Sequence, residues 1–169
     1  MGASGCGKSA VGARLAARLG RPFLDGDDLH SPANVAKMAA GTPLSDDDRL
    51  PWLQAIRAWM SEQGAQGRSG VVACSALRRS YRDALRGPAG DVVLIHLDVP
   101  RTELERRLAG RREHFMPASL LDSQLEALEP LGQGEPGVRV AVDPQAAVED
   151  TVLAVWEAMA NSSVPGPPR

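Results

Sequence analysis

A glycine-rich segment, Gly2-Ala3-Ser4-Gly5-Cys6-Gly7-Lys8-Ser9, follows the first residue of the chain. It fits the pattern G-x-x-x-x-G-K-[ST], whose glycines let backbone N–H groups approach a phosphate without obstruction by a Cβ atom. In such a loop the lysine reaches the β- and γ-phosphates of a nucleoside triphosphate, and the last hydroxyl ligates Mg²⁺. We therefore predict a phosphate-binding loop formed by Gly2, Ala3, Ser4, Gly5, Cys6, Gly7, Lys8 and Ser9.

The residues on either side of this loop constrain the fold further. Val11, Leu15 and Leu19 recur at four-residue spacing before Gly20, which predicts a helix whose N-terminus points at the bound phosphates. Such a loop normally follows a buried central strand, but here only Met1 precedes it. Two explanations are open: the start codon is assigned too late, or the chain folds with a gap that exposes the edges of both neighbouring strands.

Short apolar segments near residues 23, 72, 94 and 139 alternate with helical patterns along the rest of the chain. This alternation predicts an α/β fold in which one parallel sheet is covered by helices on both faces. The length of 169 residues fits a single domain, which we expect to span residues 1–160. The last segment, 161–169, contains three prolines and is expected to be a disordered tail.

Two carboxylates, Asp25 and Asp27, follow the first of these apolar segments. In an extended chain both point to one side, where they could hold Mg²⁺ through water or accept a proton from an attacking hydroxyl. A polar turn is the alternative use of such residues. Ligands of parallel sheets bind beyond the carboxyl ends of the strands, where Ser75 and Asp143 also lie, so we favour an active site at this rim.

The basic residues are distributed unevenly. Only two of the 19 are lysines, Lys8 and Lys37, which suggests positions where a compact charge serves better than a planar guanidinium. The chain also carries a basic cluster beside His114, formed by Arg106, Arg107, Arg111 and Arg112. This cluster is either a solvated helix face or part of a lid, at approximately 111–130, that closes over the transferring phosphate.

Composition excludes several classes of function. A net charge of −2 disfavours a broad nucleic-acid surface. No apolar run approaches the ~20 residues of a membrane helix, and no signal peptide opens the chain. Two cysteines, Cys6 and Cys74, do not suggest a disulfide framework. We therefore expect a cytoplasmic protein without nucleic-acid or membrane partners.

Three groups of residues together resemble one family. They are Phe23–His30 with Asn34, Lys37-Met38, Gly41-x-Pro43-Leu44 and Asp46-x-Asp48-Arg49-x-Pro51-Trp52-Leu53; Cys74–Arg79 with Tyr81-Arg82-Asp83; and His114-Phe115-Met116-Pro117 with Ser123-Gln124. This combination strongly resembles bacterial and animal gluconate kinases over roughly residues 2–130. The phosphate loop alone indicates only a nucleoside triphosphate, whereas the combination is far more specific.

The resemblance implies ATP-dependent phosphorylation of D-gluconate to 6-phospho-D-gluconate, and it suggests a homodimer. The implied fold is the three-layer P-loop kinase type with a small lid, similar to shikimate kinase, here with its first strand missing from the chain. By this resemblance Asp25 orders the Mg²⁺ shell and Asp27 orients or deprotonates the sugar-acid hydroxyl. Lys8 and Arg111 offset charge on the transferred phosphoryl group.

The resemblance also implies binding residues. Arg49 is the first choice for the gluconate carboxylate, since a guanidinium can bind a carboxylate through two hydrogen bonds. Arg107 and Arg111 are expected to face the phosphates, and Asp143 and Gln145 to lie beside adenine. The further polyol or carboxylate contacts are Asp27, His30, Lys37, Ser75, Arg78 and His114.

Two departures from the family pattern keep alternatives open. Glu113 stands where the family usually has glycine, so it either repels phosphates or pairs with a neighbouring arginine. The second departure is the missing strand. The alternatives are a P-loop kinase for another small hydroxy acid, and a nucleotide-binding module made inactive by the loss of that strand.

Overall fold

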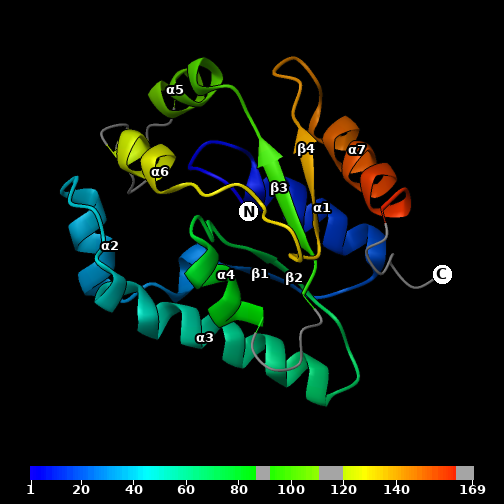
Figure 1. Cartoon of the computed structure of the whole chain (residues 1–169), viewed down its shortest axis with the longest axis horizontal. Helices are drawn as coiled ribbons and strands as arrows, with labels where there is room; N and C mark the ends of the chain where they lie inside the picture. The colour runs from blue at the N-terminus through cyan, green and yellow to red at the C-terminus, as the bar shows by residue number, and fades with distance from the viewer. Residues whose placement is uncertain (87–91, 111–119, 163–169) are drawn as a thin grey trace.

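The structure is a computed structural model of the 169-residue chain and describes residues 1–86, 92–110 and 120–162 (Figure 1). The apolar segments of the sequence form strands, as predicted. The expected disordered tail lies outside the described residues from residue 163 onward. The described strands are β1 (Phe23–Asp25), β2 (Val71–Ala73), β3 (Leu94–Asp98) and β4 (Gly137–Ala141).

All strand pairs are parallel, but they do not form one sheet. β1 pairs with β2 and places Asp25 opposite Ala73, while β3 pairs with β4 and places Asp98 opposite Ala141. Within the described ranges these are two separate two-stranded sheets. The expectation of a parallel arrangement is therefore confirmed, whereas the expectation of one continuous sheet is wrong for this chain.

The first two residues lie between the two sheets (Figure 1). The N–H of Leu97 on β3 donates to the carbonyl of Met1 at 3.0 Å, and the N–H of Gly2 donates to the carbonyl of Ser75, just after β2, at 3.1 Å. The Met1 ammonium also donates to the carbonyl of Ile95. Met1 and Gly2 thus stand where a strand joining β2 to β3 would end.

Eight helical segments surround the strands in the described ranges. The helix after the phosphate loop is confirmed, and it ends at Gly20, whose left-handed conformation (φ 62°) closes the last turn. Ser31 and Pro32 begin the next α-helix, with the Ser31 hydroxyl accepting from the N–H of Asn34. The segments are α1 (Lys8–Leu19), η1 (Gly26–Leu29, a 3₁₀ helix), α2 (Pro32–Ala39), α3 (Asp46–Ala65), α4 (Arg79–Arg86), α5 (Arg101–Ala109), α6 (Leu121–Ala127) and α7 (Val148–Ala160).

The core is divided in the same way as the sheet. One cluster joins α1, α5 and α7 to β3 and β4 through residues such as Leu15, Leu97 and Val155. A second cluster joins α3 and α4 to β2 through Trp52, Ile56 and neighbouring residues. Trp52 and Ile56 of this second cluster are almost fully buried.

Candidate active site

The glycine-rich segment forms a tight loop against the start of α1. Gly5 (φ 86°) and Gly7 (φ 96°) adopt left-handed conformations that a side chain would strain. Gly7 caps α1, so the first free N–H groups of the helix open toward the loop. The ammonium of Lys8 turns back and donates to the carbonyl of Ala3 at 3.1 Å. The loop therefore holds backbone donors, a helix N-terminus and a lysine together, as phosphate binding requires.

The two predicted carboxylates sit at the end of β1, but not in an extended chain. β1 ends at Asp25, and the 3₁₀ helix η1 begins at Gly26. The Asp25 carboxylate caps this turn by accepting from the N–H of Asp27 at 3.1 Å. The expectation that both point to one side of a strand is therefore wrong, because the chain turns between them.

A small cavity of about 30 Å³ joins six predicted residues from separate parts of the chain. Met38, Pro43, Leu44 and Leu120 complete its apolar lining. The predicted residues that line it are Ser4, Lys8, Asp27, His30, Arg49 and Ser75. A second cavity of about 270 Å³ shares Arg49 and Leu44 with it and adds Arg78 and Tyr81. Lysine, carboxylate and guanidinium thus meet around one space next to the phosphate loop.

His30 is held on this cavity by Trp52 of α3. The two rings stack with centroids 4.4 Å apart, and the indole N–H donates to the carbonyl of Gly26 at 2.6 Å. Burial lowers the pKa of His30, an effect opposed by Asp27 and reinforced by Arg49. The imidazole Nδ1 is buried and has no hydrogen-bond partner among the described residues. His30 thus lines the cavity with a lowered pKa and a buried polar atom that no described residue bonds.

Arg49 and Arg78 flank the ring of Tyr81. Their guanidinium carbons lie 5.5 Å and 5.7 Å from the ring centroid. Arg78 pairs with Asp46 at 3.2 Å. The Asp46 carboxylate also accepts a hydrogen bond from the Tyr81 hydroxyl. Burial and this hydrogen bond raise the pKa of Tyr81. Among the described residues no carboxylate pairs with Arg49, so its guanidinium is available to an anion in the cavity.

Lys37 lies outside the residues that line the cavity. Its ammonium pairs with Asp48 at 2.6 Å, and Asp48 in turn accepts from the N–H of Ser45 at the start of α3. These contacts lower the pKa of Asp48 to about 2, and the hydrogen bond from Lys37 has the largest effect. In this structure Lys37 links α2 to α3.

One arginine of the basic cluster reaches the phosphate loop. Arg107 on α5 donates to the carbonyl of Gly5 at 3.4 Å and to Glu103 at 2.6 Å. Hydrogen bonds from Arg106 and Arg107 lower the pKa of Glu103 to about 2. Both guanidiniums are thereby held beside the same carboxylate. Arg111, Glu113 and His114 lie outside the described residues.

Asp143 and Gln145 follow β4, away from the small cavity. The Asp143 carboxylate accepts from the N–H of Gln145 at 2.9 Å. The last helix, α7, begins after this turn, at Val148. Both residues line a separate cavity of about 380 Å³ with Asp150 and Thr151 of α7.

Two residues of the site were not among the predicted site residues. Gln124 of α6 accepts from the buried N–H of Ser4 in the phosphate loop at 2.6 Å, and Ser123 lines the cavity beside it. The available signal was their place in the Ser123-Gln124 pair of the family pattern. Ser4 and Gln124 are 120 positions apart, so the local spacing of residues carries no pattern that would predict their contact.

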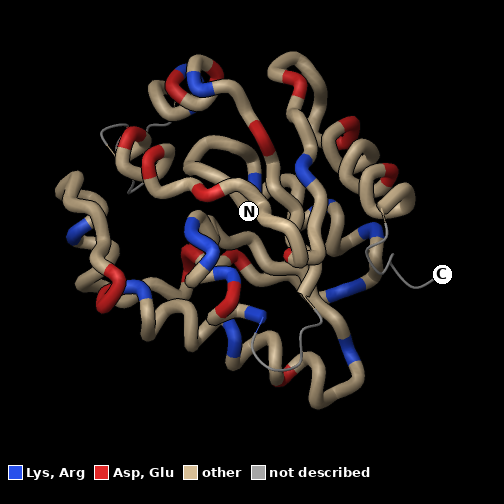
Figure 2. The backbone as a smooth tube through the Cα atoms, in the orientation of Figure 1, with Lys and Arg blue, Asp and Glu red and all other residues tan. Residues whose placement is uncertain are grey.

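Charges of both signs are interspersed over the described chain (Figure 2). In the small cavity, the cations of Lys8 and Arg49 face the single carboxylate of Asp27. Among the described residues, no helix is both long and apolar enough to cross a membrane.

Comparisons with known proteins agree with this geometry. The profile of a family described as "AAA domain" matches residues 1–131. The chain is 49% identical to a gluconokinase of Gluconobacter oxydans (strain 621H) over 154 residues, which cover 90% of this chain and 86% of that protein. An unliganded sugar kinase of Janibacter sp. HTCC2649 matches with a TM-score of 0.86 at 40% identity, covering 95% and 91% of the two chains. A gluconokinase of Sinorhizobium meliloti 1021 matches with a TM-score of 0.77 at 44% identity, covering 95% and 89%.

Proposed function

The chain belongs to the gluconokinase family of small P-loop kinases, and from this membership and the geometry of the site we propose that it phosphorylates D-gluconate with ATP. The products are 6-phospho-D-gluconate and ADP. The observation that carries the proposal is the cavity that joins Lys8 of the phosphate loop to Asp27, His30 and Arg49. These side chains bring a lysine for the phosphates, a proton acceptor and a guanidinium for an anion together next to the phosphate loop.

In the proposed reaction the primary hydroxyl of gluconate attacks the γ-phosphorus of ATP. The bond from that phosphorus to the β,γ-bridging oxygen breaks, and ADP leaves with the electron pair. Asp27 lines the cavity beside Lys8, so its carboxylate is placed to orient the hydroxyl and accept its proton. The Lys8 ammonium and the N–H groups of the loop stabilise charge on the phosphoryl oxygens.

The donor set at the loop fits Mg²⁺. Ser9 supplies a hydroxyl in the first turn of α1, and Asp25 supplies a carboxylate at the end of β1. Both are oxygen donors, and Mg²⁺ in phosphoryl-transfer sites keeps several waters and phosphate oxygens beside one or two protein ligands. When bound, the ion would neutralise charge on the β- and γ-phosphates.

Gluconate carries a carboxylate and a chain of hydroxyls, and the cavity lining suits both. Arg49 is assigned the carboxylate because its guanidinium lines the cavity without a described acidic partner. His30 and Ser75 are assigned hydroxyl contacts from the same cavity, and Arg78 from the cavity next to it. Lys37 and His114 complete the proposed substrate contacts; Lys37 must leave Asp48 to take part.

The remaining assignments concern the nucleotide. Arg107 and Arg111 are proposed to face the phosphates, and the contact of Arg107 with Gly5 supports this for the first of them. Asp143 and Gln145 are proposed to lie beside adenine, since they line a cavity at the carboxyl end of β4. A homodimer and a cytoplasmic location remain predictions from the sequence.

One observation favours a second candidate function. The sheet that supports the loop is interrupted beside Met1, so the chain as described could bind ATP without productive turnover. A coupled assay of ADP release separates the two functions, with gluconate, shikimate or a nucleoside monophosphate as acceptor. ADP release that requires gluconate supports the gluconate kinase. ATP binding without turnover of any acceptor supports the inactive nucleotide-binding module. ADP release with another acceptor alone rejects gluconate as the substrate.

A further inference from the structure

One turn of the candidate active site contains a strained residue. Residues 75–78, here called the acceptor turn, begin at Ser75, which lines the small cavity, and end at Arg78, which lines the cavity next to it. Ala76 has a φ of 43°, and it is the only non-glycine residue of the described chain with a positive φ. Alanine rarely adopts this left-handed conformation, because its Cβ crowds the following carbonyl oxygen. Such strain persists only where surrounding contacts fix it, and it clusters at functional sites.

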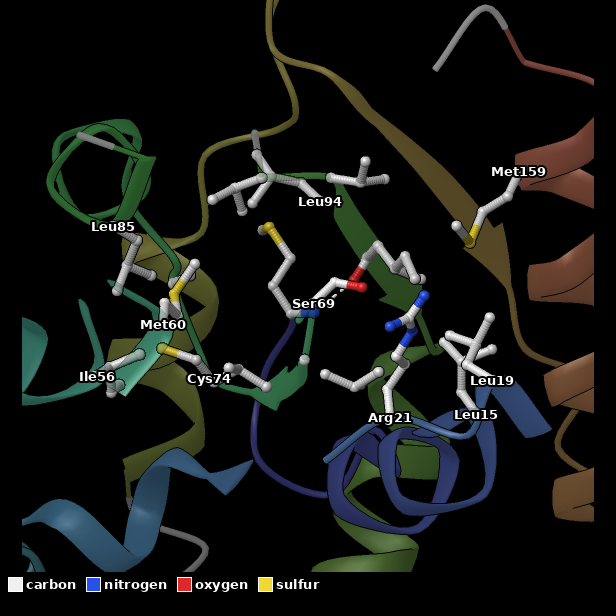
Figure 3. A pocket seen from close by; sticks show the side chains of 18 residues that line it. Leu15, Leu19, Arg21, Ile56, Met60, Ser69, Cys74, Leu85, Leu94 and Met159 are labelled. Atoms are coloured by element: carbon white, nitrogen blue, oxygen red, sulfur yellow. Dashed lines mark hydrogen bonds between the residues drawn. The ribbon is translucent and has the colours of Figure 1, made fainter. Parts of the chain in front are cut away.

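Apolar packing around the acceptor turn is incomplete. Ala76 and Cys74 line a cavity of about 340 Å³ between β2 and β3, together with Leu85 of α4 (Figure 3). Side chains beside unfilled space lose the dispersion contacts that packed neighbours would supply. The conformation of Ala76 therefore depends on the polar contacts that the turn makes.

Arg82 of α4 supplies these contacts through backbone carbonyls. Its side chain is fully buried, and Nη1 of the guanidinium donates to the carbonyls of Ala76 at 3.4 Å and Leu77 at 3.0 Å. Nη1 also donates to the carbonyl of Glu129 at 3.1 Å, and Nη2 donates to that of Pro130 at 3.3 Å. An apolar side chain has no donors for these carbonyls, whereas arginine carries its N–H groups in a fixed planar fork.

Glu135 fixes the orientation of this guanidinium. Its carboxylate accepts from Nε of Arg82 at 2.6 Å and from Nη2 at 2.9 Å, and it also accepts from the N–H of Gly132 at 2.7 Å. Both side chains of the pair are fully buried, and burying two charges costs desolvation free energy that an apolar pair would avoid. Stability alone therefore does not explain an arginine at this position, whereas its bonds to the acceptor turn do.

The acceptor turn is also tied to the segment after α6. The carbonyl of Leu77 accepts from the N–H of Glu129 at 2.9 Å, and the Glu129 carboxylate accepts from the N–H of Arg79 at 2.6 Å. α6 itself reaches the phosphate loop through the bond between Gln124 and Ser4. The acceptor turn and the phosphate loop are thus joined through one chain of contacts. Phosphoryl transfer needs this, because the attacking oxygen must lie in line with the phosphorus.

We propose that Arg82 is a positioning residue for the phosphate acceptor: held by Glu135, it keeps Ala76 in its left-handed conformation and thereby aims Ser75 and Arg78 at gluconate. The proposal rests on the proposed function, which assigns gluconate contacts to those two residues. Arg82 is not among the residues that line either cavity, so it acts only through the backbone that it bonds.

The first test is Arg82→Lys, which keeps a positive charge beside Glu135 but cannot reproduce the fork of donors. We expect KM for gluconate to rise at least about tenfold while KM for ATP changes by less than about twofold. The control is Val155→Ala, which lowers Tm by opening space in the other core cluster, away from the acceptor turn. An equal rise of KM for gluconate in Val155→Ala would overturn the proposal, because loss of stability would then explain the effect.

The second test relieves the strain at Ala76. Glycine adopts a φ of 43° freely, so a turn with Ala76→Gly no longer needs Arg82 to hold it. The double variant Arg82→Lys/Ala76→Gly is therefore expected to have a KM for gluconate within about threefold of that of Ala76→Gly alone. A merely structural role of Arg82 predicts no such recovery. If Ala76→Gly leaves the KM of Arg82→Lys unimproved, the proposal is wrong.

A milder variant covers the case in which Arg82→Lys does not fold. Glu135→Gln keeps the size of the side chain and one acceptor oxygen, so the guanidinium is loosened but still paired. We expect KM for gluconate to rise about three- to fivefold, again without a change in KM for ATP and again reversed by Ala76→Gly. A change that affects both substrates equally, or that Ala76→Gly does not reverse, overturns the proposal.

A measurement without substrate separates this proposal from the proposed function. Amide hydrogen exchange at Arg79 and Glu129, followed by NMR, is expected to be at least about tenfold faster in Arg82→Lys and to slow again in the double variant. A parent chain that does not turn over gluconate rejects the proposed function, and the exchange pattern then decides whether Arg82 holds the turn. Exchange that is unchanged in Arg82→Lys overturns the positioning role.

Discussion

The backbone N–H of Ser4, inside the phosphate loop, donates a buried 2.6 Å hydrogen bond to the side-chain oxygen of Gln124 on α6. This bond ties the loop to α6, which lies within the proposed lid at approximately 111–130. Movement of α6 is thereby coupled to the shape of the cradle that receives the phosphates.

Replacing Gln124 tests that coupling. Gln124→Glu keeps the size of the side chain and places a negative charge beside the loop, so we expect KM for ATP to rise at least about tenfold. Steady-state kinetics at varied ATP measures it. The matched control is Gln133→Glu, which adds the same charge at an exposed position before β4. Equal KM values in the two variants would remove Gln124 from loop positioning.

Lys8 is expected to be indispensable for turnover. Lys8→Ala should lower kcat by at least about a hundredfold while leaving Tm within about 2 °C, since among the described residues the ammonium donates only to the loop carbonyl of Ala3. Lys8→Arg should also be poorly active, because a planar guanidinium does not replace a compact charge. Turnover of Lys8→Ala near that of the parent would contradict the phosphate role.

Asp27 is expected to act on the hydroxyl rather than on ATP. Asp27→Asn should reduce kcat about 10²- to 10⁴-fold, the range that a positioned proton acceptor contributes, with little change in ATP affinity. Isothermal titration with a non-hydrolysable ATP analogue and initial-rate kinetics separate the two effects. A variant that keeps kcat but loses ATP affinity would reassign Asp27 to the nucleotide.

Arg49 is expected to bind the carboxylate of the acceptor. Arg49→Ala should raise KM for gluconate about 10- to 100-fold and leave KM for ATP nearly constant. Arg57→Ala removes an exposed guanidinium from the same helix, α3, and serves as the control with unchanged kinetics. If Arg49→Ala changes KM for ATP alone, the guanidinium binds the nucleotide and not the acceptor.

The most buried ion pair should govern stability in acid. Arg82 of α4 and Glu135 bond at 2.6 Å with both side chains fully buried, and Arg82 also donates to the carbonyls of Leu77 and Glu129. The pKa of Glu135 is lowered to about 2 from the usual 4.5, and the hydrogen bond from Arg82 has the largest effect. Since the folded pKa is the lower one, the stabilisation is present above pH 4.5 and disappears as pH falls toward 2.

Glu135→Ala should therefore reduce the free energy of unfolding at pH 7 by about 3–5 kcal/mol, because it leaves a buried guanidinium unpaired. Urea titrations at pH 7 and pH 3 measure the loss and its decrease in acid. Glu149→Ala breaks the exposed pair with Arg14 and should cost less than about 1 kcal/mol. Similar losses in the two variants would contradict the role of burial.

Local patterns in the sequence predicted most of the elements correctly. The spacing of Leu15 and Leu19 before Gly20 predicted α1 and its end, because period and capping depend on neighbouring residues. The turn between Asp25 and Asp27 was missed, since an Asp-Gly-Asp sequence is compatible with either an extended or a turned backbone.

Long-range features were harder to obtain from the sequence. The gathering of Asp27, His30 and Arg49 around Lys8 followed from family resemblance and from the rule that strand ends share a rim. The stacking of His30 on Trp52 had no local signal in the sequence. The split of the sheet was one of two open explanations, and only the pairing of β1 with β2 and β3 with β4 decided how this chain is arranged.

The position of the Met1 nitrogen has a practical consequence for anyone who purifies this protein. An affinity tag fused ahead of Met1 cannot hang freely in solvent, because its last residues must pass between Ser75 and Ile95. Such a tag would change the very region that supports the phosphate loop. Recombinant work on turnover should therefore place the tag at the other end of the chain and remove it before stability is compared.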